Sequence, residues 1–406
     1  MPKYYQHLLA SLILVTGALA APAMAAESPE LSDRTFRTVN KVQELIATER
    51  YSEAIEKLNG ALEGTNSRKY DRAVLLQQMG FLYSLKDNYP KAAKYFSDAL
   101  KMDALPVPVA QQVRYSLAQL YLAEEKYKQS VQTMKEWFDV AKTTGEKPQA
   151  HAYITLASAY VQLEDYRNAI PPTKQAIAMS KTPSESWYLL LMASHYELGQ
   201  LKSVAEVLRT LTTKYPAKKQ YWMQLSGVYM ELNQERNSLA TLEMAYKMGL
   251  LEDEKELMRL VNFLAYRGIP YRAAKLLETE MAKGRIANTQ DNLERLGSFW
   301  HQAKELDEAI VAYRKAYDFK PTAKNQLMIV RLMLQAKQFK QATQFTQSAA
   351  GNASGHDRAE LAYLQGMAYF ELNQPGNALQ AMKTAAQSQE MKAMASPWIA
   401  FLQEQS

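Results

Sequence analysis

Apolar residues along the chain recur in pairs of short segments, each with helical spacing. In residues 114–125, RYSLAQLYLAEE, and in residues 128–141, KQSVQTMKEWFDVA, apolar positions return every three or four residues. Spacing of this kind places the apolar side chains on one face of an α-helix. The pattern therefore predicts two amphipathic helices joined by a short turn.

A fixed set of offsets relates this pair of segments to others. In the clearest copy, two tyrosines six residues apart are followed by an alanine and two further apolar positions, at Tyr83, Tyr89, Ala92, Phe96 and Ala99. The same offsets fit Tyr121, Tyr127, Ser130, Met134 and Trp137, and also Tyr160, Tyr166, Ala169, Thr173 and Ala176. Each helix pair is therefore one copy of a repeat, and a repeat decides the fold.

One small residue of the second helix marks the register of the whole array. It recurs 33 to 39 residues apart at Ala54, Ala92, Ser130, Ala169, Val204, Ser238, Ala273 or Ala274, Ala309, Ala342 and Ala378. These positions predict ten units, with the variation in spacing placed in loops. The first unit lacks the glycine and tyrosine of its first helix, and the segment Leu257–Lys283 can be aligned in two registers.

Prolines and glycines mark the turns between helices. Pro90 falls in the first turn of a second helix, where its missing N–H costs nothing, and Gly199 and Gly268 fall between helices, where a positive φ is often needed. Pro171 and Pro172 do not fit, because they lie inside the expected second helix of the fourth unit. A late start of that helix is the favoured explanation, and a functional hinge is the alternative.

The repeat resembles the tetratricopeptide repeat (TPR). The resemblance rests on Gly80, Tyr83, Tyr89, Ala92, Phe96 and Ala99, on Gly297, Ala309, Tyr313, Ala316 and Pro321, and on Gly366, Tyr369, Ala378 and Ala385. It implies an all-α superhelical solenoid of about ten helix-turn-helix repeats, in which stacked neighbours share one core. The array is expected over residues 35–392. Residues 393–406 are expected to form a C-terminal capping helix with Ser396 as N-cap and Pro397 at its first position.

The N-terminal residues predict export. Lys3 is followed by the apolar run Leu8–Ala20, and Ala23 and Ala25 are small residues at the positions that a signal peptidase reads. Residues 1–25 are therefore expected to be a cleaved signal peptide, and residues 26–34 a linker. The absence of cysteine excludes a disulfide framework. A periplasmic location is the simplest expectation.

Charged and titratable residues show no catalytic pattern. The 48 basic and 42 acidic side chains are interspersed, without the basic stripe of nucleic-acid-binding proteins. The five histidines form no metal-binding pair, and no glycine-rich phosphate loop is present. His195 and His301 are expected to be partly exposed on first helices. The chain is therefore expected not to be an enzyme and to have no metal or cofactor. The tyrosines at the repeat positions (Tyr83, Tyr121, Tyr160, Tyr229 and Tyr369) are assigned to core packing.

The TPR resemblance also implies where a partner would bind. In TPR arrays the first helices line a concave face, and one stripe of their side chains recognises a protein or peptide. We name the corresponding positions the groove stripe: Phe81, Tyr115, Gln119, Ile154, Ser158, Leu189, Tyr196, Met223, Met230, Glu294, Ser298, His301, Tyr363, Met367 and Phe370. Their mostly apolar and neutral character suits an extended or helical peptide. The alternative for each residue is burial between turns of the solenoid.

A narrower resemblance concerns residues 221–251 and 260–286. These segments, above all Gly268–Ala274 and the Lys283–Gly284 turn, are similar to periplasmic TPR proteins that accompany TonB, ExbB and ExbD-type energy transducers. The similarity implies an accessory scaffold, without chemistry of its own, for iron-siderophore or haem uptake, with TonB-like, ExbB-like or ExbD-like partners. The alternative is an envelope-biogenesis coordinator that binds peptidoglycan, outer-membrane assembly or polysaccharide-export proteins.

Overall fold

The computed structural model describes residues 30–65, 67–348 and 353–404. The described residues form helices and connecting turns without a strand, as the sequence predicts. The chain divides into two compact units, residues 1–214 and residues 215–406. The expected signal peptide, residues 1–25, lies outside the described residues. None of the described helices is long and apolar enough to cross a membrane.

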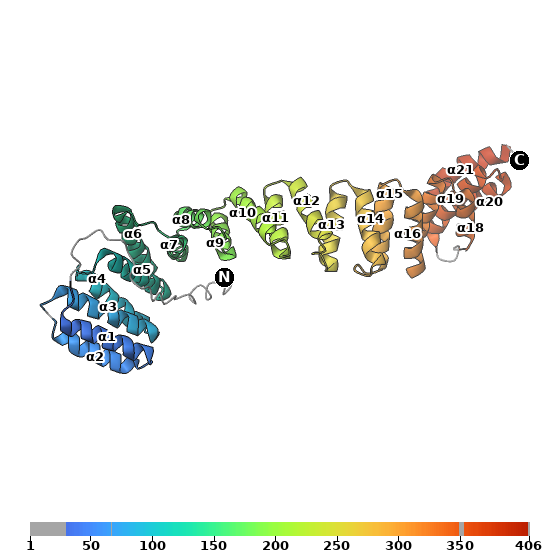
Figure 1. Cartoon of the computed structure of the whole chain (residues 1–406). Coiled ribbons are helices and arrows are strands. Elements are labelled where there is room, and N and C mark those ends of the chain that lie inside the picture. Colours follow the sequence, from blue (N-terminus) through green and yellow to red (C-terminus); the bar gives the residue numbers. More distant parts are fainter. Residues whose placement is uncertain (1–29, 66, 349–352, 405–406) are drawn as a thin grey trace. The chain divides into compact units, whose positions relative to one another are not determined.

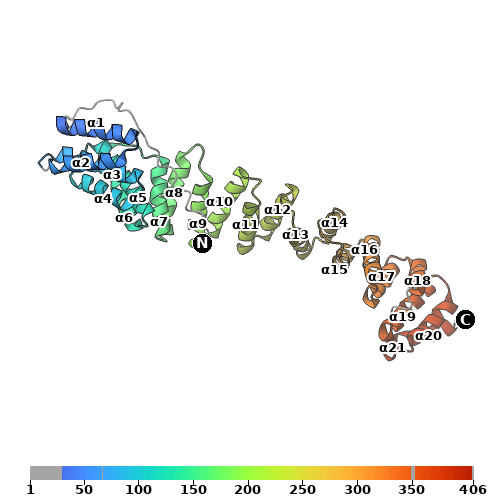
Figure 2. The same cartoon turned by 90° about the horizontal axis from the view of Figure 1, so that it is seen from below.

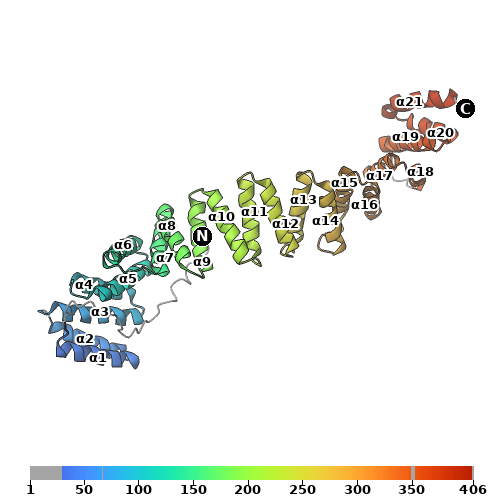
Figure 3. The same ribbon diagram turned by 45° about the horizontal axis from the view of Figure 1, so that its top comes forward.

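The first unit contains five helix pairs that stack in chain order (Figure 1). Figure 3 shows α1 to α4 of this stack from another side. The helices are α1 (Asp33–Ala47), α2 (Tyr51–Glu63), α3 (Lys69–Leu85), α4 (Tyr89–Lys101), α5 (Val107–Ala123), α6 (Tyr127–Thr144), α7 (Ala150–Gln162), α8 (Tyr166–Met179), α9 (Glu185–Glu197) and α10 (Leu201–Lys214).

The second unit contains five further pairs and a terminal helix (Figure 2). Its helices are α11 (Lys219–Glu231), α12 (Glu235–Lys247), α13 (Glu254–Tyr266), α14 (Pro270–Ala282), α15 (Gln290–Gln302), α16 (Leu306–Phe319), α17 (Ala323–Gln335), α18 (Phe339–Ser348), α19 (Gly355–Glu371), α20 (Pro375–Ala385) and α21 (Gln389–Glu404). The ten predicted repeats are thus confirmed as ten helix pairs.

The small residues that set the register are buried in every pair. Ala54, Ala92, Ser130, Ala169, Val204, Ser238, Ala273, Ala274, Ala309, Ala342 and Ala378 are each at most 2% exposed. Two glycines on first helices show why small residues are needed. A Cβ at Gly297 would lie 2.6 Å from the ring of Tyr313, and a Cβ at Gly366 would lie 2.9 Å from Met382. The two helices of a pair therefore approach closely at these points.

The turn inside each pair has the same backbone conformation. One residue has a positive φ, and the N–H of the residue after it donates to a carbonyl five residues earlier, as in Asn88 to Tyr83 at 2.9 Å. This is the Schellman ending of a helix, which satisfies the last carbonyl groups. The left-handed positions are Glu49, Asp87, Glu125, Glu164, Gly199, Asn233, Gly268, Lys304, Lys337 and Asn373. The turns predicted at Gly199 and Gly268 are confirmed.

The expected late start of the helix that contains Pro171 and Pro172 is wrong. Helix α8 begins at Tyr166, so Pro171 and Pro172 lie within it and the helix does not start late. Pro172 is buried together with Ala169, Thr173 and Ala176, so the face of α8 that packs against the neighbouring helices includes Pro172, whereas Pro171 is exposed. That packing outweighs the loss of two backbone N–H donors.

The terminal helix also starts earlier than expected. Helix α21 begins at Gln389, so Ser396 is not an N-cap and Pro397 lies inside the helix. The hydroxyl of Ser396 donates to the carbonyl of Lys392 at 2.8 Å, one turn back. Met391, Ala395 and Leu402 are buried along one face, and packing of that face against α19 and α20 explains why the helix continues through the proline (Figure 3).

The tyrosines of the repeat positions are packed to different extents. Tyr160 is buried, whereas Tyr83, Tyr121, Tyr229 and Tyr369 are half-buried. The ring of Tyr83 stacks on that of Tyr95 on the second helix of its pair, with centroids 5.4 Å apart. The expected packing role is therefore confirmed for Tyr160 and Tyr83, and the half-buried tyrosines of the set are partly exposed.

Candidate functional site

The groove stripe of the first unit lies on helices that contact one another. The first helices α5 and α7 touch, as do α7 and α9, so their outward side chains form one surface. Tyr196 on α9 is 56% exposed. Phe81, Tyr115, Gln119, Ser158 and Leu189 are half-buried. The structure therefore brings Tyr115, Gln119, Ser158, Leu189 and Tyr196 onto adjoining helices.

Ile154 does not belong to this surface. Its side chain is 5% exposed and packs in a cluster with Ala176 and Trp187. The expectation that it contacts a partner is wrong, because the start of α9 covers this part of α7.

Tyr115 links two first helices. Its hydroxyl lies 3.3 Å from Oγ1 of Thr155 on α7, and its ring centroid lies 6.1 Å from that of Trp137. Burial raises the pKa of Tyr115 above its ordinary value. Tyr115 therefore contributes to packing between helices, while part of its side chain remains accessible at the surface.

A run of aromatic rings continues from Tyr115 across the first unit. Trp137 meets Phe138 edge to face at 5.1 Å between centroids, and Phe138 lies 4.8 Å from Tyr153 on α7. Phe138 and Tyr153 are half-buried. No sequence pattern predicted this run of rings, because its members come from α5, α6 and α7 at different repeat positions. Contacts at these distances stabilise the packing of adjacent pairs.

In the second unit the residues of the groove stripe differ in exposure and in the neighbours that they contact. Met230 on α11 is 38% exposed, whereas Met223 is half-buried against the core. Ser298, His301, Tyr363 and Met367 are half-buried. The ring of Phe370 lies 5.1 Å from Trp398 and 6.0 Å from Phe401, both on α21. Phe370 is thus engaged by the terminal helix, and Met230 is the most open member.

Glu294 is held by neighbours within the protein. Its carboxylate accepts hydrogen bonds from Lys324, Asn325 and Gln290, each at 2.9 Å. Burial acts to raise the pKa of Glu294, but these hydrogen bonds outweigh it and the pKa lies below its ordinary value. Since its oxygens are already occupied, Glu294 is a poor candidate for contact with a partner.

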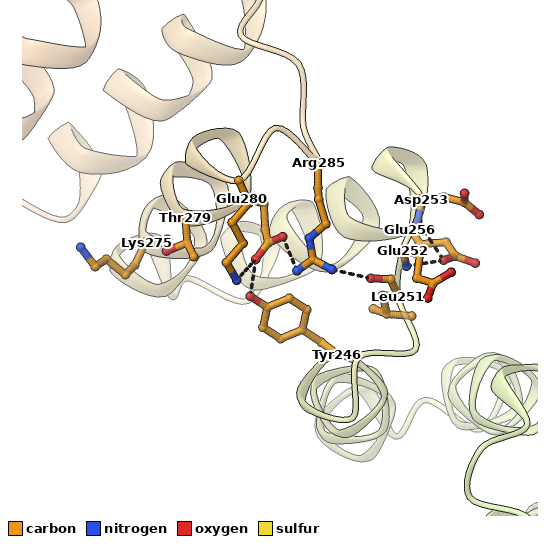
Figure 4. Close-up of polar contacts among 10 residues, drawn as sticks. Tyr246, Leu251, Glu252, Asp253, Glu256, Lys275, Thr279, Glu280 and Arg285 are labelled. Carbon is orange, nitrogen blue, oxygen red and sulfur yellow. Dashed lines mark hydrogen bonds and ion pairs between the residues drawn. The ribbon is translucent and has the colours of Figure 1, made fainter.

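A second polar network, which sequence reasoning missed, surrounds Glu280 (Figure 4). Glu280 is fully buried on α14 and accepts from the hydroxyl of Tyr246 at 2.6 Å and from Lys283 at 3.1 Å, and it pairs with Arg285. Arg285 also donates to the carbonyl of Leu251 at 3.4 Å. The network therefore ties α12, α14 and the loop after each of them together.

The pKa values follow from this arrangement. Burial acts to raise the pKa of Glu280, but the donors around it hold the pKa below its ordinary value. Burial and the hydrogen bond to Glu280 raise the pKa of Tyr246 to about 12. Both groups are thus kept in the protonation states that they have near neutral pH, which suits a structural role.

The histidines differ from what the sequence predicted in one case. His301 is half-buried, as expected, but His195 is 3% exposed, and its Nδ1 lies 2.6 Å from Oε1 of Gln200. The expectation of an exposed His195 is wrong, because this residue occupies the packing position that holds a tyrosine in other pairs. Within the described residues, no group of three His, Cys, Asp or Glu side chains is placed to hold a metal ion.

Comparison with family models decides the nature of the repeats. Two models, both of the tetratricopeptide repeat, match residues 86–141 and 150–182. These two segments of the chain are therefore similar to tetratricopeptide repeats. The matched TPR segments begin in the turn before α4 and extend through α8, which is the part where the sequence offsets are clearest.

Solved structures that are similar to the chain include TPR proteins. A TPR protein from Parabacteroides merdae has 12% identity, with 71% of this chain and 94% of that chain covered and a TM-score of 0.38. YrrB, described as a TPR protein with an unusual peptide-binding site, has 16% identity, 48% and 93% coverage and a TM-score of 0.37. MamA from Desulfovibrio magneticus RS-1 has 19% identity, 47% and 99% coverage and a TM-score of 0.37. No curated protein matches the chain.

Proposed function

We propose that the chain is a scaffold that binds a protein or peptide partner through the exposed side chains of its first helices. The observation that carries the proposal is the exposure of Tyr196 and Met230, two large side chains of the groove stripe. TPR arrays use the surface formed by successive repeats for binding. Each of the two residues lies on a first helix, one in each compact unit.

The chemistry of this surface favours a peptide recognised by its side chains. Besides Tyr196, the groove stripe of the first unit offers the half-buried Leu189, Ser158 and Gln119, which are apolar or neutral. A tyrosine supplies a large contact area with a polar tip, and a methionine adapts to differently shaped partners. An extended or helical segment with apolar anchors matches such a surface.

The experiment compares first-helix residues with matched second-helix residues. Tyr196→Ala and Met230→Ala are expected to weaken crosslinking of the partner in intact cells. The controls are Tyr271→Ala, which is 51% exposed on α14, and Met244→Ala, which is 46% exposed on α12. Equal effects of the first-helix and second-helix variants would refute a binding role for the first helices.

We also propose that this scaffold works in the periplasm as an accessory of a TonB-type uptake system. Support comes from the export signal expected in residues 1–25 and from the resemblance of residues 221–251 and 260–286 to TPR proteins that accompany such systems. Affinity purification from native envelopes is expected to recover TonB-like, ExbB-like or ExbD-like components, and deletion of the gene is expected to impair growth on siderophore-bound iron or haem.

The competing role is coordination of envelope biogenesis. Recovery of no transducer component would count against the TonB proposal. Division, permeability or exopolysaccharide defects that iron does not rescue would instead favour a scaffold for peptidoglycan, outer-membrane assembly or polysaccharide-export proteins.

A further inference from the structure

A basic cleft lies between the two helices of the first pair, α1 and α2. Its volume is about 610 Å³. Arg34, Arg37 and Lys41 line it from α1, and Lys57 lines it from α2, together with the single carboxylate of Glu56. The cleft is distinct from the groove stripe, none of whose residues lines it.

Two of these cations, Arg37 and Lys41, occupy repeat positions that are buried packing positions in the next two pairs. In the next two pairs, the residues equivalent to Arg37 are Leu75 and Val113, and those equivalent to Lys41 are Met79 and Leu117. All four are at most 4% exposed. They are buried because the second helix of the preceding pair packs against them, as α2 does against α3 and α4 against α5. Among the described residues no helix precedes α1, so Arg37 and Lys41 face outward.

A polar end on a repeat array needs no ligand to explain it, because exposed terminal repeats require polar faces for solubility. A face that only confers solubility is best served by charges of both signs. This cleft instead holds four cations and one carboxylate. No ion pair with another described residue involves Arg34, Arg37 or Lys57, whereas Lys41 pairs with Glu44 at 2.6 Å. The excess of positive charge therefore favours an anionic occupant.

The spacing of the cations indicates the shape of that occupant. Arg34, Arg37 and Lys41 follow one another along one face of α1, over about 10 Å at a rise of about 1.5 Å per residue. An extended peptide places every second side chain on the same side, about 6.6 Å apart. Two alternate carboxylates thus match the separation of Arg37 and Lys41, while a single phosphate ion would span only part of the row.

The floor of the cleft is open. Gly60 lies there, and a Cβ at this position would meet nothing within 4 Å. At one end, the guanidinium group of Arg34 lies over Gly64, where a Cβ would be 2.7 Å from Nη1. We propose that this cleft binds an acidic segment of a partner protein in extended conformation, with carboxylates at alternate residues held by Arg37, Lys41 and Lys57.

The probe is a fluorescent ten-residue peptide with glutamate at every second position, titrated into the whole chain at low salt. The double variant Arg37→Glu/Lys57→Glu is expected to weaken binding at least about tenfold, since opposite charges steer and hold such a ligand. The matched control is Lys128→Glu/Lys174→Glu, which reverses two exposed lysines on α6 and α8, and it is expected to change binding less than about twofold. Gly60→Gln keeps every charge but fills the floor, and it is expected to weaken binding as well.

Four outcomes would overturn the proposal. The first is equal weakening by the control double variant, and the second is full binding by Gly60→Gln, since either would show a diffuse charge effect. The third is binding of phosphatidylglycerol vesicles or inorganic phosphate in preference to the peptide, which would identify a phosphate-bearing ligand. The fourth is tighter binding of a peptide with the sequence of residues 26–32, which would make the chain itself the occupant.

Discussion

Gly80 on α3 faces the ring of Phe96 on α4 so closely that a methyl group at position 80 would overlap ring atoms Cδ1 and Cε1. Phe96 is 1% exposed, and its ring also meets Phe81 edge to face at 5.2 Å, so it has little freedom to move. The closeness of the two helices in this pair therefore depends on the absence of a side chain at position 80.

Gly80→Ala is expected to lower the free energy of unfolding by about 1–3 kcal/mol, because the added methyl group overpacks the crossing. Gly60→Ala on α2 is the matched control. The methyl group added at position 60 meets no neighbour, and this variant should raise the free energy of unfolding by up to about 1 kcal/mol through the higher helix propensity of alanine. Denaturant unfolding followed by circular dichroism measures both, and a stabilising Gly80→Ala would contradict the packing described.

Tyr246→Phe removes a donor from the fully buried carboxylate of Glu280. At neutral pH the variant is expected to lose about 1–3 kcal/mol of stability, the cost of an underpaired buried polar group. The exposed Tyr266, 72% accessible, supplies the control Tyr266→Phe, which should change stability little.

The pH dependence of the difference between wild type and Tyr246→Phe has a defined sign. The pKa of Glu280 is lowered in the folded protein, so its contribution is present above the unfolded pKa of about 4.3 and is lost as the pH falls through the lower folded value. The pKa of Tyr246 is raised to about 12, so its contribution is complete below the unfolded pKa of about 10 and is lost as the pH rises toward 12. Melting curves from pH 3 to 11 should show the difference narrowing at both ends, and a constant difference would refute the network.

Tyr115 and Tyr196 are expected to respond differently to truncation although both belong to the groove stripe. Tyr115→Ala should lower the melting temperature, because Tyr115 packs on Trp137 and contacts Thr155. Tyr196→Ala should change stability by less than about 0.5 kcal/mol, because its side chain is mainly in solvent. A large loss of stability in Tyr196→Ala would assign that residue to the core.

Pro171→Ala is expected to stabilise α8. Pro171 is exposed and has no N–H to donate to the carbonyl of Arg167, four residues earlier in the helix. Alanine restores that donor and should raise the free energy of unfolding by up to about 3 kcal/mol. Pro172 is buried, so Pro172→Ala would leave a cavity and serves as the contrasting variant. An unchanged melting temperature in Pro171→Ala would show that the local backbone already compensates for the proline.

The repeat fold was predictable because a small side chain is required wherever two helices cross closely. Ala92, Ala309 and Ala378 recur for that reason, and each is fully buried in the structure. The offsets depend only on residues near in sequence, so they can be read without knowing how pairs stack. Proline positions were less predictable, because packing of a long apolar face kept α8 and α21 helical through Pro172 and Pro397.

The candidate site was predictable in register but not in exposure. Ile154 and Tyr196 are both groove-stripe positions, yet one is 5% exposed and the other 56%, because the neighbouring pair decides what is covered. The network of Glu280 was not predictable at all. Its partners Tyr246 and Leu251 are about thirty residues away in sequence, on a preceding pair, and polar positions follow no offset of the repeat.

The left-handed turn inside each pair offers a route to a more stable protein. Eight of the ten positions carry residues other than glycine, and a side chain in that conformation costs about 1–2 kcal/mol. Substitutions such as Lys304→Gly or Glu125→Gly would relieve this cost without altering either of the two surfaces proposed for binding. Because the turns are separate, such changes can be combined in one variant, which would allow weakened binding mutants to be studied in a background that tolerates them.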